Sequence, residues 1–194
     1  QAVNWDFAGE KIRRAVQAGQ EVRVLNLFGY TGAASLACAA AGAHVCHVDA
    51  SKGMVAWARE NAVASGLEDK PVRWLVDDCV KFVQREQRRG NTYQAIIMDP
   101  PSYGRGPNGE VWKLEEQLFR LVDLCRPILA PDALFFLLNS YTTGLSPAVM
   151  EYLLGVQLQK SFGGKISSSE IGLPVTSSGL VLPCGSTAIW ESGD

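Results

Sequence analysis

Short apolar segments alternate with longer amphipathic segments along most of the chain. The apolar segments, which we expect to be strands, cover residues 22–28, 43–48, 72–76, 93–98 and 133–138. They are apolar throughout and do not alternate between polar and apolar positions. That pattern is typical of parallel strands buried on both faces of a sheet.

The segments between these strands carry helix signals. We expect helices over residues 31–41, 51–65, 78–89, 111–129 and 147–159, and a charged helix near the start of the chain. Thr31 and Ser51 are placed to act as N-caps, and Gly42 and Gly66 to end the same two helices. The sequence therefore predicts strands that alternate regularly with helices.

The tail differs from the rest of the chain. Residues 165–191 hold two strand-like stretches with too few residues between them for a helix, so we expect them to be antiparallel. The whole pattern predicts an α/β fold with a doubly wound, Rossmann-like, mostly parallel sheet and an antiparallel C-terminal strand. We expect one domain over residues 1–194, and because residue 1 is Gln, we also expect an upstream region that is missing here.

Composition and charge narrow the function classes. The chain has 194 residues, 47% of them hydrophobic, and a formal net charge of −2. It is therefore not a protein that binds nucleic acid through a basic surface all over, and such a partner would need a local patch. No apolar run approaches the roughly 18 residues of a membrane span, and no secretory signal is recognisable, so we expect no membrane association.

The five cysteines favour a reducing compartment. Their number is odd and no Cys-x-x-Cys pair occurs, which predicts reduced, mostly buried thiols in a cytoplasmic protein. His44, Cys46 and His47 lie close together in sequence. On a strand, however, His47 points to the face opposite the other two, so we expect no metal site.

The candidate chemistry follows the strands. A loop with two glycines, residues 26–33, follows the first strand but matches neither a Walker loop nor the Gly-x-Gly-x-x-Gly of nicotinamide-binding proteins. Asp49 follows the second strand, Asp78 the third, and Asp99-Pro100-Pro101 the fourth. Because ligands of such sheets bind beyond the carboxyl ends of the strands, these residues predict a site. The alternative is purely structural, with the acids as N-caps and the prolines as strand stops.

These segments resemble those of a known family. Four segments resemble motifs of class I S-adenosylmethionine-dependent methyltransferases. They are Leu25-Asn26-Leu27-Phe28-Gly29-Tyr30-Thr31-Gly32, Val48-Asp49-Ala50-Ser51, Asp77-Asp78 and Met98-Asp99-Pro100-Pro101. More narrowly, they resemble the bacterial family that includes the 23S ribosomal RNA cytosine-5 methyltransferases. Further matching residues are Gly104, Arg105, Gly106, Gly109, Glu110, Val111 and Trp112.

The resemblance implies S-adenosylmethionine as cofactor and gives roles to the strand-end residues. The implied cofactor-binding residues are Phe28, Gly29, Tyr30, Thr31, Gly32, Asp49, Ala50, Ser51, Asp78, Cys79 and Asp99. The implied catalytic residues are Asp99, Pro100 and Pro101, and the candidate substrate-binding residues are Ser102, Tyr103 and Tyr141. Gln1 and Trp5 resemble the end of a segment that closes over the cofactor in relatives.

RNA, and ribosomal RNA in particular, is the substrate that the resemblance implies. One face of a predicted helix carries Lys81, Arg85, Arg88 and Arg89. This face is either a patch that binds phosphate groups or a solvated charged face, and we favour the second interpretation. Tyr103, Trp112 or Tyr141 could stack on a base, although ordinary packing is the default expectation for Trp112. The alternatives are a small-molecule or protein substrate, a cofactor-binding fold without turnover, and a nicotinamide-dependent dehydrogenase. The sequence indicates no oligomeric state.

The target atom is predicted from a missing thiol. Methylation at carbon 5 of a pyrimidine needs a thiolate that first adds to carbon 6. The positions where such a cysteine is expected hold Ser102 and residues 139–141, and none of them is a cysteine. We therefore predict that the target is a nitrogen or a ribose oxygen, with Asp99 orienting or deprotonating it.

Overall fold

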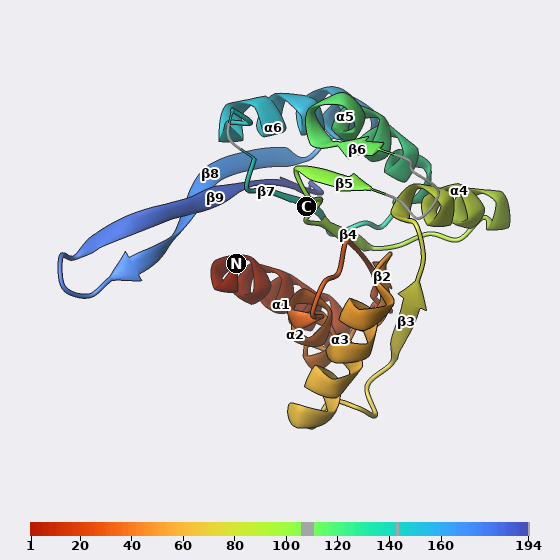
Figure 1. The fold of residues 1–194 in the computed structure, drawn as a ribbon. Helices are drawn as coiled ribbons and strands as arrows, with labels where there is room; N and C mark the ends of the chain where they lie inside the picture. Colours follow the sequence, from red (N-terminus) through yellow and green to blue (C-terminus); the bar gives the residue numbers. More distant parts are fainter. Residues whose placement is uncertain (106–110, 143, 194) are drawn as a thin grey trace.

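The computed structural model describes residues 1–105, 111–142 and 144–193 (Figure 1). The resemblance residues Gly106, Gly109 and Glu110 lie outside this part of the chain. The strands are β1 (Arg23–Leu27), β2 (His44–Asp49), β3 (Val72–Val76), β4 (Ala95–Met98), β5 (Tyr103–Arg105), β6 (Val111–Lys113), β7 (Phe135–Ser140), β8 (Lys165–Val175) and β9 (Leu180–Glu191). The helices are α1 (Ala2–Gln17), α2 (Ala33–Ala40), α3 (Lys52–Ala64), α4 (Cys79–Arg89), α5 (Leu114–Cys125), η1 (Arg126–Ile128), α6 (Pro147–Leu154), η2 (Gly155–Gln159) and α7 (Lys160–Phe162).

Seven strands form one sheet in the order β3-β2-β1-β4-β7-β9-β8. Neighbours from β3 to β7 are parallel, whereas β9 runs antiparallel to both β7 and β8. The predicted doubly wound sheet with an antiparallel C-terminal part is thus confirmed. The strand order reverses between β1 and β4, and ligands of such sheets bind at the carboxyl ends next to this point.

Helices cover both faces of the sheet, with α1, α2 and α3 on one side and α4, α5 and α6 on the other (Figure 1). The α4–α6 side has a core of large side chains, among them Phe82, Leu121 and Phe136. The α1–α2 side is richer in alanine and includes Ile12 and Phe135. Phe135 and Phe136 lie on opposite sides because successive strand side chains alternate, so both faces of β7 are buried.

Three predicted helices differ from the structure at their ends. Residues 111–113 are the strand β6, which pairs with β5, and the helix begins only at Leu114. Thr31 is not an N-cap, because α2 begins at Ala33 after Gly32, whose φ is +85°. The α-helix predicted over residues 147–159 ends at Leu154 and continues as a π-helical turn, η2. Helical periodicity does not reveal pairing between distant residues or a change of helical pitch.

Two predicted caps are confirmed. The Ser51 hydroxyl accepts a hydrogen bond from the Met54 N–H at 3.4 Å, at the start of α3. The Asp78 carboxylate accepts one from the Lys81 N–H at 2.8 Å, at the start of α4. Both side chains therefore satisfy amides that the first helical turn leaves without partners.

The cysteines are free thiols, as predicted. Four of them, Cys38, Cys46, Cys79 and Cys125, are buried, and Cys184 is exposed on β9. Burial raises the pKa of Cys38 to about 12 and that of Cys46 to about 11, so these thiols stay protonated and unreactive near neutral pH. Within the described ranges, no helix is long and apolar enough to cross a membrane.

Candidate active site

A cavity of about 450 Å³ lies at the carboxyl edge of the sheet. Its lining residues are Phe28, Tyr30, Asp49, Ala50, Ser51, Met54, Asp78, Cys79, Val80, Asp99, Pro100, Pro101, Ser102, Gly104, Trp112 and Tyr141. Most of the predicted site residues are therefore brought together, since the segments that follow parallel strands meet at one edge. Gly29, Thr31, Gly32 and Tyr103 do not line the cavity.

The loop after β1 has an unusual backbone. Phe28 and Tyr30 have φ values of +55° and +50°, in the left-handed region that side chains other than glycine rarely adopt. Such conformations persist only where the surroundings enforce them, and they are common at ligand sites. The Gly29 N–H donates to the carbonyl of Val48 at 3.0 Å, which fixes the loop to the end of β2.

Gly29 lies directly against a buried histidine. A Cβ atom at this position would come within 2.3 Å of Cε1 of His47, so only glycine fits. His47 is completely buried and shares a hydrogen bond of 2.9 Å with Ser35 Oγ, which also accepts from Asn26 Nδ2 at 2.9 Å. Burial lowers the pKa of His47 to about 4, so its ring is neutral at pH 7. The contact between Gly29 and the His47 ring therefore restricts the conformation of the loop.

Gly32 and Thr31 also shape this loop. Besides its positive φ, Gly32 has no room for a side chain, because a Cβ would lie 2.9 Å from that of Ala58 in α3. The carbonyl of Thr31 accepts a hydrogen bond from Asn61 Nδ2 at 2.9 Å. Both residues therefore seat the loop against α3.

Asp49 connects this loop to the end of β2. Its Oδ2 accepts from the Tyr30 N–H at 2.9 Å, and its Oδ1 accepts from the Ser51 N–H at 2.8 Å. These two bonds fix the plane of the carboxylate at the cavity wall. Because each carboxylate oxygen has further acceptor capacity, the group is oriented to accept two hydroxyl groups of a ligand.

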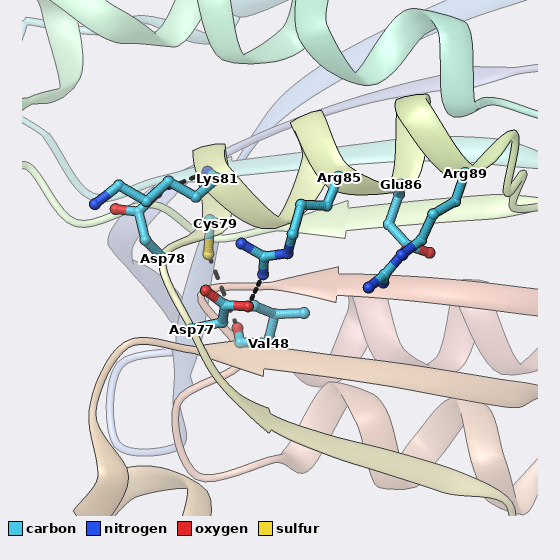
Figure 2. Close-up of polar contacts among 8 residues, drawn as sticks. All are labelled: Val48, Asp77, Asp78, Cys79, Lys81, Arg85, Glu86 and Arg89. Carbon is cyan, nitrogen blue, oxygen red and sulfur yellow. Dashed lines mark hydrogen bonds and ion pairs between the residues drawn. The ribbon is translucent and has the colours of Figure 1, made fainter.

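The third strand end places Asp78 and Cys79 at the cavity (Figure 2). The Cys79 Sγ points down to the carbonyl of Val48, 4.0 Å away, and burial raises the pKa of this thiol. The Cys79 thiol is therefore protonated and forms part of the cavity wall. Asp78 lies beside it at the start of α4.

Two of the four basic residues predicted to share one face of α4 are paired with acids (Figure 2). Arg85 forms an ion pair with Asp77, and Arg89 forms one with Glu86 at 3.1 Å. Of the predicted basic cluster, these two arginines have their charge offset within the protein. The arrangement favours the solvated-face interpretation over the phosphate patch.

The Asp99 carboxylate has one buried oxygen without a partner in the described part of the chain. Its Oδ2 accepts from Gln1 Nε2 at 2.7 Å, whereas its buried Oδ1 has no hydrogen-bond partner among the described residues. Burial raises the pKa of Asp99 to about 6. A buried acceptor without a partner costs free energy. Asp99 lines the cavity, and a ligand N–H or O–H that reached this oxygen would satisfy it.

Trp112 is a site residue that the sequence analysis placed in ordinary packing. Its indole Nε1–H donates to the Pro101 carbonyl at 2.6 Å, and its ring centroid lies 5.4 Å from that of Phe28. The β5–β6 hairpin thus joins the loop after β4 to the loop after β1. The signal in the sequence was an aromatic residue shortly after Asp-Pro-Pro, but its pairing partner is not local.

The remaining wall residues complete the cavity. Ser102 Oγ lies 2.6 Å from Thr142 Oγ1, which joins the ends of β4 and β7. Tyr141 lines the cavity and is 47% exposed, while Tyr103 is 52% exposed and lies in β5 outside the lining. Met54 and Val80, which the sequence analysis missed, are apolar residues near the starts of α3 and α4.

The charge of the cavity selects its ligands. Its described lining contains three carboxylates, Asp49, Asp78 and Asp99, and no lysine, arginine or histidine. Such a wall favours a cationic ligand group and disfavours a pyrophosphate. A nucleoside joined to a sulfonium fits this chemistry and a cavity of this size, whereas a nicotinamide dinucleotide does not. No group of three or more metal-ligating side chains occurs among the described residues.

Comparison with known proteins agrees with this geometry. The family model of S-adenosylmethionine-dependent methyltransferases matches residues 7–145. The ribosomal RNA large subunit methyltransferase K/L of Chromohalobacter salexigens is 32% identical over 130 residues, or 66% of this chain and 17% of that protein. The Shewanella baltica protein of the same name is 37% identical over 100 residues, which are 50% of this chain and 14% of that protein.

Solved structures show the same fold. The S-adenosylmethionine-dependent methyltransferase of Agrobacterium tumefaciens is 44% identical and has a TM-score of 0.90. The match covers 98% of this chain and 61% of that protein's chain. The crystal structure of SMU.776 complexed with SAH is 26% identical, with a TM-score of 0.67, and matches 87% of this chain with 45% of its own. The chain thus spans less than two thirds of these relatives.

Proposed function

The chain belongs to the family of S-adenosylmethionine-dependent methyltransferases, and from that premise we propose that the cavity described above is its cofactor site. Asp49 would bind the two ribose hydroxyls and Asp78 the adenine amine. The loop 28–32 would hold the methionine part. What supports this assignment is the cavity's size and its acidic wall, together with the orientation of the Asp49 carboxylate by the Tyr30 and Ser51 amides.

The cofactor supplies a methyl group already activated by the sulfonium, so the protein's main task is to align the acceptor with it. Neither Pro100 nor Pro101 has an N–H group, and both have a fixed φ. The Asp99 carboxylate and the Pro100 carbonyl are then acceptors for the target group. The Trp112 hydrogen bond to the Pro101 carbonyl holds this segment in place.

We propose that the acceptor atom is a nitrogen that carries a proton. Two observations support this proposal: Asp99 lines the cavity, and its buried Oδ1 has no partner among the described residues. When ionised, this oxygen would accept a hydrogen bond from the target N–H and stabilise the positive charge that develops on the nitrogen during transfer.

Carbon 5 of a pyrimidine fits this site less well. Cys79 is the one cysteine in the described cavity lining, and its sulfur points to the Val48 carbonyl. Cys125 is completely buried. A thiolate that adds to a base ring must reach it, and neither of these sulfurs is placed to do so. Cys184 is exposed on β9 but is not among the described lining residues. This supports a target other than carbon 5.

RNA is the proposed substrate, and ribosomal RNA within that class. The curated relatives are named as ribosomal RNA large subunit methyltransferases. Tyr141, which lines the cavity, and Tyr103 in β5 offer aromatic rings on which an unstacked base could lie. We propose a cytoplasmic reaction, in line with the free cysteines.

A product analysis tests this function. RNA from a strain that lacks the gene is incubated with the protein and cofactor labelled in its methyl group, and its nucleosides are analysed by mass spectrometry. The expected product is one labelled N-methylated nucleoside. Labelled 5-methylcytidine or a ribose-methylated nucleoside would contradict the nitrogen target. RNA without label would contradict the substrate class.

A further inference from the structure

A chain of three side-chain amides leads from the interior of the protein to Asp99. Asn4 Nδ2 donates to Asn139 Oδ1 at 2.8 Å, Asn139 Nδ2 donates to Gln1 Oε1 at 3.0 Å, and Gln1 Nε2 donates to Asp99 Oδ2 at 2.7 Å. Asn139 and Gln1 each accept with the amide oxygen and donate with the amide nitrogen, so all three bonds point the same way. The chain joins α1 to the ends of β7 and β4.

We propose that Asn139 is a positioning residue for methyl transfer: through Gln1 it holds Asp99 so that Oδ2 is engaged and Oδ1 faces the acceptor group. The first turn of α1 is then part of the active site. This inference rests on the proposed role of Asp99. It adds Asn4, Asn139 and Gln1 to the site, and none of them lines the cavity.

Burial shows that the chain is more than a surface contact. Asn4 and Asn139 are each 2% exposed, and buried amides are costly unless their groups are paired. Gln1 has no such constraint, because it is only half-buried and its long side chain has many rotamers. Its oxygen is held by Asn139, so the direction of its NH₂ group toward Asp99 is set from the buried end.

The consequence for Asp99 is geometric. A carboxylate has two equivalent oxygens and rotates about its last bond, so one oriented donor is enough to decide where the other oxygen points. With Oδ2 bound to Gln1, Oδ1 is the oxygen left for the ligand. The same donor favours the ionised carboxylate against the effect of burial. Tyr141 interacts with both groups: its pKa is raised by its burial and by the Asp99 carboxylate, and lowered by a hydrogen bond with Gln1.

The test is made on the free protein first. The variants are Asn139→Leu, which has a similar volume and no amide, and Gln1→Leu, which removes the donor itself. The titration of Asp99 is followed by NMR of aspartate labelled at its carboxyl carbon. Loss of a hydrogen bond to a charged group is expected to raise the pKa of Asp99 by about one unit in both variants. In the double variant, the shift should equal that of either single one.

Gln20→Leu is the matched control. Gln20, between α1 and β1, also has a side-chain amide that donates to a distant residue: its Nε2 donates to the Asp132 carbonyl, just before β7, at 2.9 Å. This bond lies at the amino ends of the strands, away from Asp99. If Asn139 only fastens α1 to the sheet, Asn139→Leu and Gln20→Leu will both lower the melting temperature and leave the titration of Asp99 unchanged. That result would overturn the proposal.

Activity provides the second readout. With RNA from a strain lacking the gene as acceptor, kcat is expected to fall about tenfold in Asn139→Leu, while KM for the cofactor stays near its original value. An unchanged kcat in a variant whose Asp99 pKa has shifted would contradict the positioning role. If no RNA is methylated even by the original protein, the proposed substrate fails, and the NMR titration still decides the inference.

Discussion

Asp99→Asn is expected to slow methyl transfer at pH 8 by about 10²-fold or more, because it replaces the carboxylate that accepts the target proton. The amide has nearly the same shape, so the fold and the cavity should remain. Affinity for the cofactor, measured by calorimetry, should change only a few-fold. The measurement is the single-turnover rate with saturating labelled cofactor.

The pKa of Asp99 also predicts how the rate of methyl transfer changes with pH. The carboxylate acts as an acceptor only when ionised, and burial raises the pKa of Asp99 to about 6. The rate should therefore fall as the pH is lowered through about 6, and this dependence should disappear in Asp99→Asn. Asp69→Asn, on the turn before β3 at the opposite edge of the sheet, is the control and should keep the original profile. A full rate in Asp99→Asn would refute the assigned role.

Gly29→Ala is the second change with a large expected effect. The new Cβ would lie 2.3 Å from Cε1 of His47, whose ring is completely buried and held by Ser35. Forcing an extra carbon into a packed interior costs about 1–3 kcal/mol. The loop must move to relieve the contact, so we expect both a lower melting temperature and at least about tenfold weaker cofactor binding.

Gly53→Ala is its control. Gly53 lies in α3, close to the same cavity, but the nearest atom to its added Cβ would be Ser51 Oγ at 3.9 Å. Alanine in a helix is more stable than glycine by up to about 1 kcal/mol. This variant should melt at the same or a higher temperature and bind the cofactor as before. Equal behaviour of the two variants would show that His47 does not restrict the loop.

Much of the site was predictable because of the parallel sheet. Asp49, Asp78 and Asp99 are 50 residues apart from first to last in the sequence, yet each follows a buried apolar strand. Once the strands are taken as parallel neighbours, their following residues must meet at one edge. The apolar pattern alone therefore placed these acids together, and the motif around Asp99 added the chemistry.

Other parts depend on contacts that no local pattern contains. The hydrogen bond from Gln1 to Asp99 joins residues 98 positions apart. The resemblance placed Gln1 near the cofactor, but no local pattern named Asp99 as its partner. The strand β6 was predicted as helix because its residues fit the helical period and its pairing with β5 is a tertiary feature. For the same reason, Trp112 was expected in ordinary packing by default.

The central claim is that the acidic cavity binds S-adenosylmethionine through Asp49. Isothermal titration calorimetry of the folded protein with S-adenosylmethionine, and of Asp49→Ala under the same conditions, tests it most directly. Loss of hydrogen bonds to a charged group predicts binding that is about 10- to 100-fold weaker in the variant. Absence of binding to the original protein at millimolar cofactor, or equal affinity of both proteins, would contradict the account.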